Sequence, residues 1–338
     1  MILIVGDIGG TKTELAIYST EKGPYHPLVN KTFPSSSHEN LEEIINQFLR
    51  EIDMPVTRAC FGVAGPVIDG RAKITNLPWV IDASKLKSTF GWDSVNLLND
   101  LEAVAYSIPI LKQDDISTIN VGKPEPNGNI AIIAPGTGLG EGFLTSTDNG
   151  YHIHASEGGH ASFSPTNPLE DGLLKYLREQ RGYKHVSIER VCSGGLGIPN
   201  IYAYLKEIGY AEEPDWLSKQ LENSPDPTPI IIDAAKDKNR STELCKKTLE
   251  MFMSILAAEA GNFALKVLAT GGIYLGGGIV PRILDQIQQP LFLESLWNKG
   301  RFRKMLENIP VHVIVNNKSG LIGAAAYELG SNIGERKE

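Results

Sequence analysis

Three glycine-rich turns, each directly after a short apolar segment, constrain the fold of this chain more than any other feature. They are GDIGGTK at 6–12, GTGLG at 136–140 and GGG at 276–278. The apolar segments before them are short and continuous, which is typical of strands buried on both faces. Glycine lets a backbone approach an anion closely, and successive N–H groups in such a turn form an anion-binding nest. Any one turn alone could be a plain hairpin, but three at strand ends predict phosphate binding.

The common nucleotide and hydrolase motifs are absent from the sequence. No G-x-x-x-x-G-K-[ST] run occurs, which excludes a P-loop. The GTGLG turn continues with Glu141 and a returning strand, so the dinucleotide fingerprint is also missing. Neither H-E-x-x-H nor G-x-S-x-G is present. The phosphate-binding turns therefore belong to another type of nucleotide site.

The remaining patterns predict an α/β protein of two domains with a mixed sheet. Apolar residues from Leu41 to Ile52 recur with helical spacing, and Ser36 with Glu39 offers a capping box before them. Asp82 and Asp100 are each placed to open a helix. Strand, glycine turn and strand recur after residue 116, which indicates a second unit. A long apolar helix is predicted at 242–268 and a last helix at 321–329, while residues 213–230, rich in Pro, Glu, Asp and Ser, are predicted to form a surface excursion.

Length, charge and cysteine usage exclude several classes of protein. The 338 residues suggest two domains. With 32 Lys+Arg against 40 Asp+Glu, the net charge is −8, and no long basic run occurs, so nucleic acid is not an expected partner. No apolar stretch approaches 18 residues, so no membrane span is predicted. The three cysteines (Cys60, Cys192 and Cys245) are too far apart for a disulfide framework or a C-x-x-C metal site, which indicates a reducing cytoplasm.

The set of motifs, in this order, resembles the bacterial glucokinases of the actin-like ATPase and sugar-kinase superfamily. Residues 7–12 resemble the first phosphate loop, 136–140 the second, and 271–278 the adenosine motif. The segments LND at 98–100, EGGH at 157–160 and IERV at 188–191 complete the match, which covers nearly the whole chain. The resemblance implies a two-domain actin-like ATPase (ribonuclease H-like) fold with a central interdomain cleft. We expect a small α/β domain at 1–110 plus 318–338 and a large one at 111–317.

The resemblance also implies the reaction, which is ATP-dependent phosphorylation of glucose at the 6-hydroxyl, giving glucose 6-phosphate and ADP. Asp100 would be the general base. The residues expected to bind the sugar are Asn99, Asp100, Glu157, His160, Glu189, Asn76 and Gly65. The residues expected to bind the nucleotide are Asp7, Gly9, Gly10, Thr11, Lys12, Gly136, Thr137, Gly138, Gly276, Gly277 and Gly278. From the residues alone, Asp100 could equally be a helix N-cap, Glu157 and His160 a polar loop, and Glu189 an exposed helix end.

The expected cofactors and partners follow from the same resemblance. ATP and Mg²⁺ would be required, with Asp7 orienting the metal through water. Zinc is not expected, because His160 is followed by ASFSP and the next cysteine is Cys192, unlike the Cys-rich motif of ROK sugar kinases. The first strand begins at Ile2, so no N-terminal helix-turn-helix is expected. The family implies a homodimer. The alternatives are a kinase for fructose, mannose or an N-acetylated amino sugar, and a chaperone-like nucleotide-binding protein that binds no sugar.

Overall fold

The computed structural model describes residues 1–74, 77–148, 150–237, 239–240 and 242–330. The chain divides into two compact units, each of which is described by itself. The first unit contains Met1–Asp115, Leu144–Ala155 and the chain from Asn316 onward, and the second contains Ile116–Phe143 and Ser156–Val315. The α/β character predicted from the sequence is confirmed in both units. The expected domain boundaries, 1–110 plus 318–338 and 111–317, stay a prediction.

The first unit is built on a five-stranded sheet with the order β3-β2-β1-β4-β8. Strand β1 is antiparallel to β2 and parallel to β4, which is in turn parallel to β8. A small sheet with the order β5-β6-β7 accompanies it. The elements are β1 (Ile2–Ile8), β2 (Lys12–Ser19), β3 (Val29–Pro34), α1 (Leu41–Arg50), β4 (Val56–Val63), β5 (Val67–Ile68), β6 (Arg71–Lys73), β7 (Val80–Asp82), α2 (Ala83–Phe90), β8 (Ser94–Asn99), α3 (Asp100–Ser107) and α12 (Ser319–Leu329).

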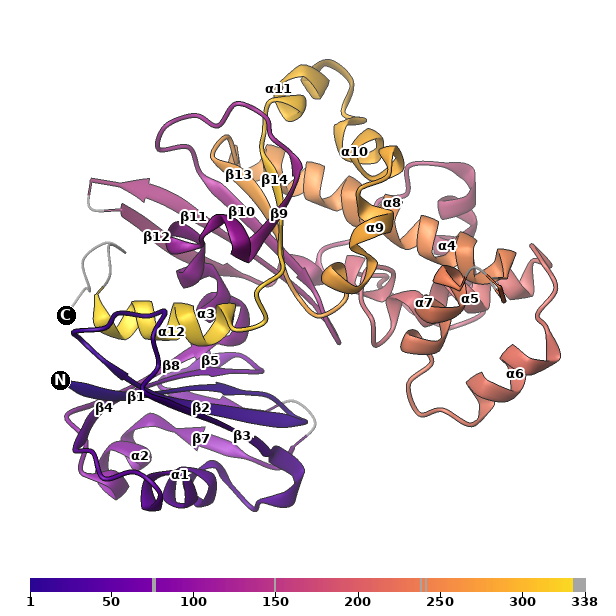
Figure 1. The fold of residues 1–338 in the computed structure, drawn as a ribbon. Helices are drawn as coiled ribbons and strands as arrows, with labels where there is room; N and C mark the ends of the chain where they lie inside the picture. Colours follow the sequence, from indigo (N-terminus) through magenta and orange to yellow (C-terminus); the bar gives the residue numbers. More distant parts are fainter. Residues whose placement is uncertain (75–76, 149, 238, 241, 331–338) are drawn as a thin grey trace. The chain divides into compact units, whose positions relative to one another are not determined.

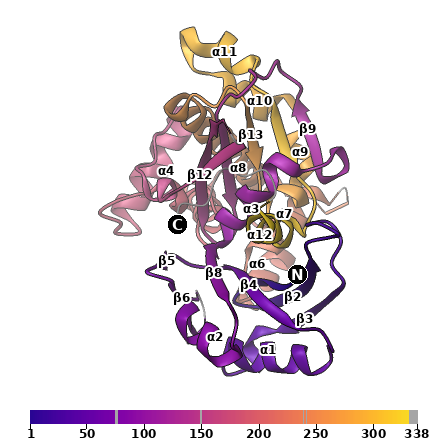
Figure 2. The ribbon, with the colours of Figure 1, turned by 90° about the vertical axis from the view of Figure 1, so that its left-hand side faces the viewer.

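The two faces of this sheet are covered by helices from different parts of the sequence. Side chains alternate along a strand, so Ile4 and Ile8 of β1 join the core under α1 and α2. Leu3 and Val5 point to the other face and join α3 and α12 (Figures 1 and 2). The second core includes Leu321, although some three hundred residues separate it from β1. Helix α12, from the C-terminal end of the sequence, therefore completes the first unit.

Helix caps show where local sequence reasoning succeeds and fails. Asp82 caps α2 as predicted, because its carboxylate accepts a hydrogen bond from Lys85 N. The capping box predicted at Ser36 is wrong, since Ser36 lies in a short 3-10 turn. Helix α1 is instead capped by Asn40, whose side chain accepts from Glu43 N. Asparagine and serine cap comparably well, so the apolar periodicity rather than the cap residue decides where this helix begins.

The second unit contains a six-stranded sheet with the order β12-β11-β10-β13-β14-β9. Strands β10, β13 and β14 run parallel, and β9 is antiparallel to β14. Residues 144–155 of the β11–β12 hairpin are grouped with the first unit. The elements are β9 (Ile116–Asn120), β10 (Ile130–Pro135), β11 (Leu139–Thr147), β12 (Gly150–Ser156), α4 (Pro168–Glu179), α5 (Gly197–Glu207), α6 (Asp215–Glu222), α7 (Thr228–Lys236), α8 (Glu243–Val267), β13 (Gly272–Leu275), α9 (Leu284–Ile287), α10 (Pro290–Trp297), α11 (Arg303–Glu307) and β14 (Val311–Ile314).

The core of the second unit surrounds α8, which packs against β10, α5, α7 and α10 (Figure 1). The long helix predicted at 242–268 is confirmed, and most of its side chains are buried. The segment predicted as a surface excursion, 213–230, contains α6, of which Leu217 is fully buried. In the described part of the chain, no helix combines the length and the apolar character that crossing a membrane requires.

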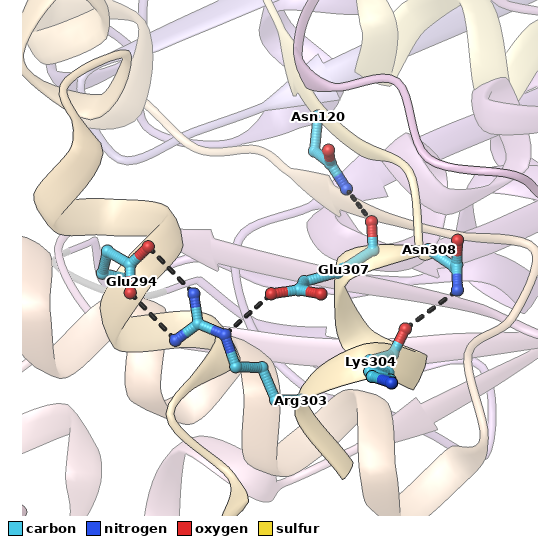
Figure 3. Close-up of polar contacts among 6 residues, drawn as sticks. All are labelled: Asn120, Glu294, Arg303, Lys304, Glu307 and Asn308. Atoms are coloured by element: carbon cyan, nitrogen blue, oxygen red, sulfur yellow. Dashed lines mark hydrogen bonds and ion pairs between the residues drawn. The ribbon is translucent and has the colours of Figure 1, made fainter.

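A polar cluster ties α10, α11 and β9 together at the surface of the second unit (Figure 3). Arg303 donates to both carboxylate oxygens of Glu294, at 2.9 and 3.0 Å, and from Nε to Glu307 at 2.7 Å. Asn120 of β9 donates to the backbone carbonyl of Glu307 at 2.9 Å. The charged groups are substantially exposed, so the cluster orients α11 more than it stabilises the fold.

Candidate functional site

The first glycine turn connects β1 to β2 and is held by a buried serine. Gly9 N donates to Lys12 O at 3.0 Å, which closes the turn. Ser35 N donates to Thr11 O at 3.0 Å, and Ser35 Oγ donates to Gly9 O at 2.7 Å. These bonds occupy carbonyl oxygens of the turn, while Thr11 and Lys12 stay exposed. Ser35 was not predicted, because nothing in the local sequence links it to the turn.

Asp7 lies near the end of β1, paired with Glu14 on β2 and with Gly62 on β4. Burial raises the pKa of this carboxyl to about 6, and the negative charge of Asp100 adds to the increase. Lys12 opposes the shift in pKa only in part. The increase in pKa therefore comes first from burial and then from neighbouring carboxylates.

A second cation also acts on Asp7. Lys318 forms an ion pair with the buried carboxylate of Glu14, and its charge lowers the pKa of Asp7. The next turn begins α12, where a Cβ built on Gly320 would lie 3.7 Å from Asp7 Oδ2. The positive end of the α12 dipole is thus directed at Asp7. Sequence reasoning missed Glu14 and Lys318, since the two partners are 304 positions apart.

Asn99 and Asp100 lie where β8 ends and α3 begins, and they have different roles there. Asn99 is the N-cap, and its side-chain oxygen accepts from Leu101 N at 3.0 Å. Glu102 completes a capping box with the backbone N–H of Asn99. Asp100 is therefore the first residue of the helix and not its cap. The simple capping explanation does not account for an aspartate at this position.

The same asparagine holds a predicted sugar-site glycine. Asn99 Nδ2 donates to Gly65 O at 2.9 Å, and Gly65 has a φ of 154°. A φ of this kind is readily adopted only by glycine, so Gly65 keeps the turn after β4 close to Asn99. Asn76, the other residue predicted near the sugar, lies outside the described residues.

The Asp100 carboxyl has the environment that a general base needs. Its side chain is exposed, yet desolvation by the surrounding protein raises its pKa. The Leu101 N–H, at 2.8 Å from Oδ1, and the Asn99 side chain partly counteract this increase. A carboxylate with a raised pKa holds a transferred proton more readily than an ordinary aspartate.

In the second unit, the structure brings together three of the residues predicted to bind sugar. His160 Nε2 lies 3.7 Å from Glu157 Oε2 and 3.9 Å from Glu189 Oε2. Glu157 and His160 are exposed at 79% and 62% of their side chains, so their polar atoms are free to meet a ligand. His185 contacts the backbone carbonyl of His160 at 2.9 Å. The three side chains form one polar group that can donate and accept hydrogen bonds.

The second glycine turn, at 136–138, is adjacent to this group. A Cβ built on Gly138 would lie 3.2 Å from Glu189 Oε2. Gly194 N donates to Gly136 O at 2.7 Å, and Gly195 N donates to Thr137 O at 3.0 Å. These two glycines were not predicted to belong to the site. Their sequence signal is the run SGGLG at 193–197, which follows no strand and so did not stand out.

The third glycine turn packs against the second. Gly277 has a φ of 78°, and a Cβ there would lie 2.4 Å from the carbonyl oxygen of Pro135. Gly276 N donates to Ile133 O at 2.8 Å. The turns after β10 and β13 therefore lie side by side. The predicted site residues that the structure describes are divided between the two units. Those from Asp7 to Asp100 belong to the first unit, and those from Gly136 to Gly278 belong to the second.

Among the described residues, no group of three or more His, Cys, Asp or Glu side chains is arranged to hold a metal ion. Asp7 is thus a single carboxylate rather than part of a cage. Mg²⁺ is commonly held by one or two carboxylates together with substrate phosphates and water, and such a site needs no cage.

Comparisons with known proteins agree with this geometry. The glucokinase family model matches residues 4–330. A glucokinase from Nostoc punctiforme is 43% identical over 336 residues, covering 96% of this chain and 98% of the relative. The crystal structure of a glucokinase from an Antarctic psychrotroph is 32% identical, with a TM-score of 0.81 and 98% and 99% of the two chains covered. A ROK family glucokinase from Streptomyces griseus, solved with glucose and AMPPNP, shares the fold at 21% identity, with a TM-score of 0.59 and 97% and 99% covered.

The fold and its glycine turns define a sugar kinase with the actin-like ATPase fold, as the sequence predicted. Within that class, the chain belongs to the glucokinase family. The members of this family are glucose kinases, so the predicted resemblance and enzyme class are both confirmed.

Proposed function

We propose that the chain transfers the γ-phosphoryl group of ATP to the 6-hydroxyl of glucose, giving glucose 6-phosphate and ADP, with Asp100 as the general base. The observation that carries this assignment is the position of Asp100 at the start of α3. Asn99 provides the helix cap, so the Asp100 carboxylate is exposed and uncommitted to capping, and its pKa is raised. A phosphoryl acceptor hydroxyl needs such a group to take its proton.

The polar residues around a sugar must both accept and donate hydrogen bonds. We assign this role to Asn99, Gly65 and Asn76 from the first unit, and to Glu157, His160 and Glu189 from the second. Support comes from the Glu157–His160–Glu189 group and from the bond between Asn99 and Gly65. The Streptomyces griseus relative was solved with glucose.

The three glycine turns are assigned to ATP. Backbone N–H groups in such turns stabilise phosphate oxygens without a long side chain. Carbonyls of the first two turns are already engaged by Ser35, Gly194 and Gly195, which fixes the turn conformation. Lys12 and Thr11 add a charge and a hydroxyl next to the first turn.

We propose that Mg²⁺ accompanies ATP and is oriented by Asp7 through water. The residues fit this group, because the Asp7 carboxyl lies near the end of β1, before the first glycine turn, and the negative charge of Asp100 acts on it. When bound, Mg²⁺ would supply charge neutralisation on the transferred phosphoryl group. Asp7 would hold hydrated metal, and Asp100 would accept the hydroxyl proton.

The test is ADP formation by the purified chain with and without glucose. A glucose-dependent rate is expected, and equal rates would show that no sugar is phosphorylated. A panel with fructose, mannose and N-acetylated amino sugars, compared by kcat/KM, tests the sugar itself. A higher kcat/KM for one of these would replace glucose as the substrate.

From the family resemblance we also propose a homodimer that works in the cytoplasm and has no nucleic-acid or membrane partner. Sedimentation equilibrium at several protein concentrations tests the dimer, and a monomer at all concentrations would contradict it.

A further inference from the structure

The carboxyl group of Glu141 lies against the glycine pair of the loop at 157–160. We propose that Glu141 is a positioning residue, which holds this loop for glucose when its carboxyl is neutral and loosens it when ionised. The inference rests on the proposed function, because it takes the loop to be part of the glucose site. Glu141 itself touches no predicted ligand and takes no part in the chemical step.

The contacts between Glu141 and the loop are close and specific. A Cβ built on Gly158 would lie 2.0 Å from Glu141 Oε2, so the carboxyl is packed against the Gly158 backbone. Ser156 Oγ donates to the Glu141 carbonyl at 3.1 Å and accepts from Gly158 N at 3.1 Å. Gly159 packs in the same way on the carbonyl of Leu139. The loop therefore rests on β11 at three successive points, and Glu141 provides the only ionisable side chain among them.

Glu141 is an unusual residue to find in this place. Its exposed fraction is 1%, and its Oε1 atom has no hydrogen-bond partner within the part of the chain that the structure describes. A buried carboxylate without partners is costly, whereas the neutral acid is much less so. The position thus favours a proton on Glu141.

The charged groups around Glu141 act on its pKa in opposite directions. Glu259 of α8 is 5% exposed, and its negative charge raises the pKa of Glu141, although burial is the larger cause. Lys266 of α8 opposes this increase, but it also bonds Glu259 at 3.3 Å. Cys192, after the IERV segment, is fully buried, and its own pKa is raised. Lys299 Nζ donates to Asn262 Oδ1 at 2.7 Å, and Asn262 in turn donates to Glu259 at 3.0 Å.

Burial, with a smaller contribution from the charge of Glu259, raises the pKa of Glu141 to about 7. The ionised fraction then rises from about one tenth at pH 6 to about nine tenths at pH 8. Ionisation places a negative charge beside the Gly158 backbone and close to Glu259, with no hydrogen-bond donor among the described residues at Oε1. The loop that carries Glu157 and His160 shifts to relieve this charge, and glucose binding weakens as the pH rises.

Two variants of Glu141 and one matched control test the proposal. Glu141→Gln keeps the size of the side chain and fixes it as neutral, while Glu141→Ala removes the support. Glu170→Gln is the control, because Glu170 is likewise buried in the same unit, at 2% exposed, but accepts its hydrogen bonds from Thr166. Glucose affinity is measured by isothermal titration calorimetry, and glucose KM, ATP KM and kcat by ADP formation, from pH 6 to pH 8.

We expect the wild-type glucose Kd and KM to rise at least about threefold from pH 6 to pH 8, and the E141Q values to stay within about 1.5-fold. E141A should raise glucose KM at least about fivefold with kcat and ATP KM within twofold, which is the signature of lost ground-state binding. E170Q should behave like the wild type. The melting temperature of E141Q should exceed the wild-type value at pH 8 and match it at pH 4.5, since a raised carboxyl pKa lowers stability above its ordinary range.

The same pH dependence in E141Q and wild type would overturn the proposal, and so would unchanged glucose binding in E141A. E141Q retains the volume of the wild type, so it decides the question even if E141A fails to fold. The proposed function fails in a different way, namely when the wild-type enzyme forms ADP without regard to glucose. Calorimetric glucose binding still tests the role of Glu141 in that case, and the absence of any glucose binding would refute both.

Discussion

Replacing Asp100 by asparagine separates a catalytic from a structural role for this residue. The change keeps the size of the side chain and removes its ability to accept a proton. Loss of a general base typically lowers the rate by about 10²–10⁴, which is roughly 3–5 kcal/mol of barrier. The structure predicts little loss of stability, because the cap is formed by Asn99 and the capping box by Glu102. Removing one negative charge at a helix N-terminus costs about 0.3–1 kcal/mol, and relief of the desolvated carboxylate opposes that cost.

The assay measures kcat by ADP formation, glucose Kd by calorimetry and the melting temperature, on the same preparations. Asp82→Asn is the matched control, because Asp82 also stands at the start of a helix in the first unit, where it caps α2, and is not among the residues assigned to the site. We expect D100N to lose at least a hundredfold in kcat, with glucose Kd within about fivefold and the melting temperature nearly unchanged. D82N should keep full activity. A D100N variant within tenfold of wild-type kcat would remove Asp100 from the role of base.

Three further changes test other parts of the site. Gly277→Ala should lower the melting temperature and raise ATP KM, because its φ of 78° and the 2.4 Å approach cost about 1–3 kcal/mol. Gly278→Ala is the control, since no described atom lies within 4 Å of a Cβ there, and equal melting temperatures for both would contradict the strain. Lys318→Met leaves the buried Glu14 carboxylate without its ion-pair partner and should lower the free energy of unfolding in urea by about 1–3 kcal/mol. The double variant with Glu14→Gln should regain part of that free energy, whereas independent sites would give additive losses. Asp7→Asn should have a higher melting temperature than wild type at pH 7.5 but not at pH 4. A carboxyl pKa of about 6, against the ordinary 3.8, means that the wild-type protein loses at most about 3 kcal/mol of stability as the pH rises. The same difference in melting temperature at both pH values would refute this.

The parts of the fold that follow from short-range patterns were predictable. Apolar periodicity located α1 and α8, and the glycine runs marked three strand ends. The helix α6 was missed because its 8 residues carry only a short apolar stripe, in which Leu217 is buried and Trp216 and Leu221 are partly buried against the core of the unit. The Asp and Glu residues of this helix are exposed, so the composition alone gives no sign of its buried side.

The candidate site divides in the same way. Residues within motifs, such as Asn99 and Asp100, could be found because neighbouring positions share one turn. The supports of the site could not, since Ser35 and Lys318 reach it from other elements. A single sequence does not show which distant side chain offsets a buried charge. In the sequence, Glu141 stands out only as the residue that follows the GTGLG turn.

The placement of α12 has a consequence for the order in which the chain can assemble during synthesis. Residues 116–315 contain the whole of the second unit, so its core can form as soon as they have left the ribosome. The first unit emerges earlier, but one face of its sheet needs Leu321, Ala324 and Ala325 to cover Leu3 and Val5. Until those residues arrive, α3 covers that face only in part, and the rest is open to water or to a chaperone. The first half to be translated is therefore the last to reach its native core, the reverse of the usual N-terminal-first order.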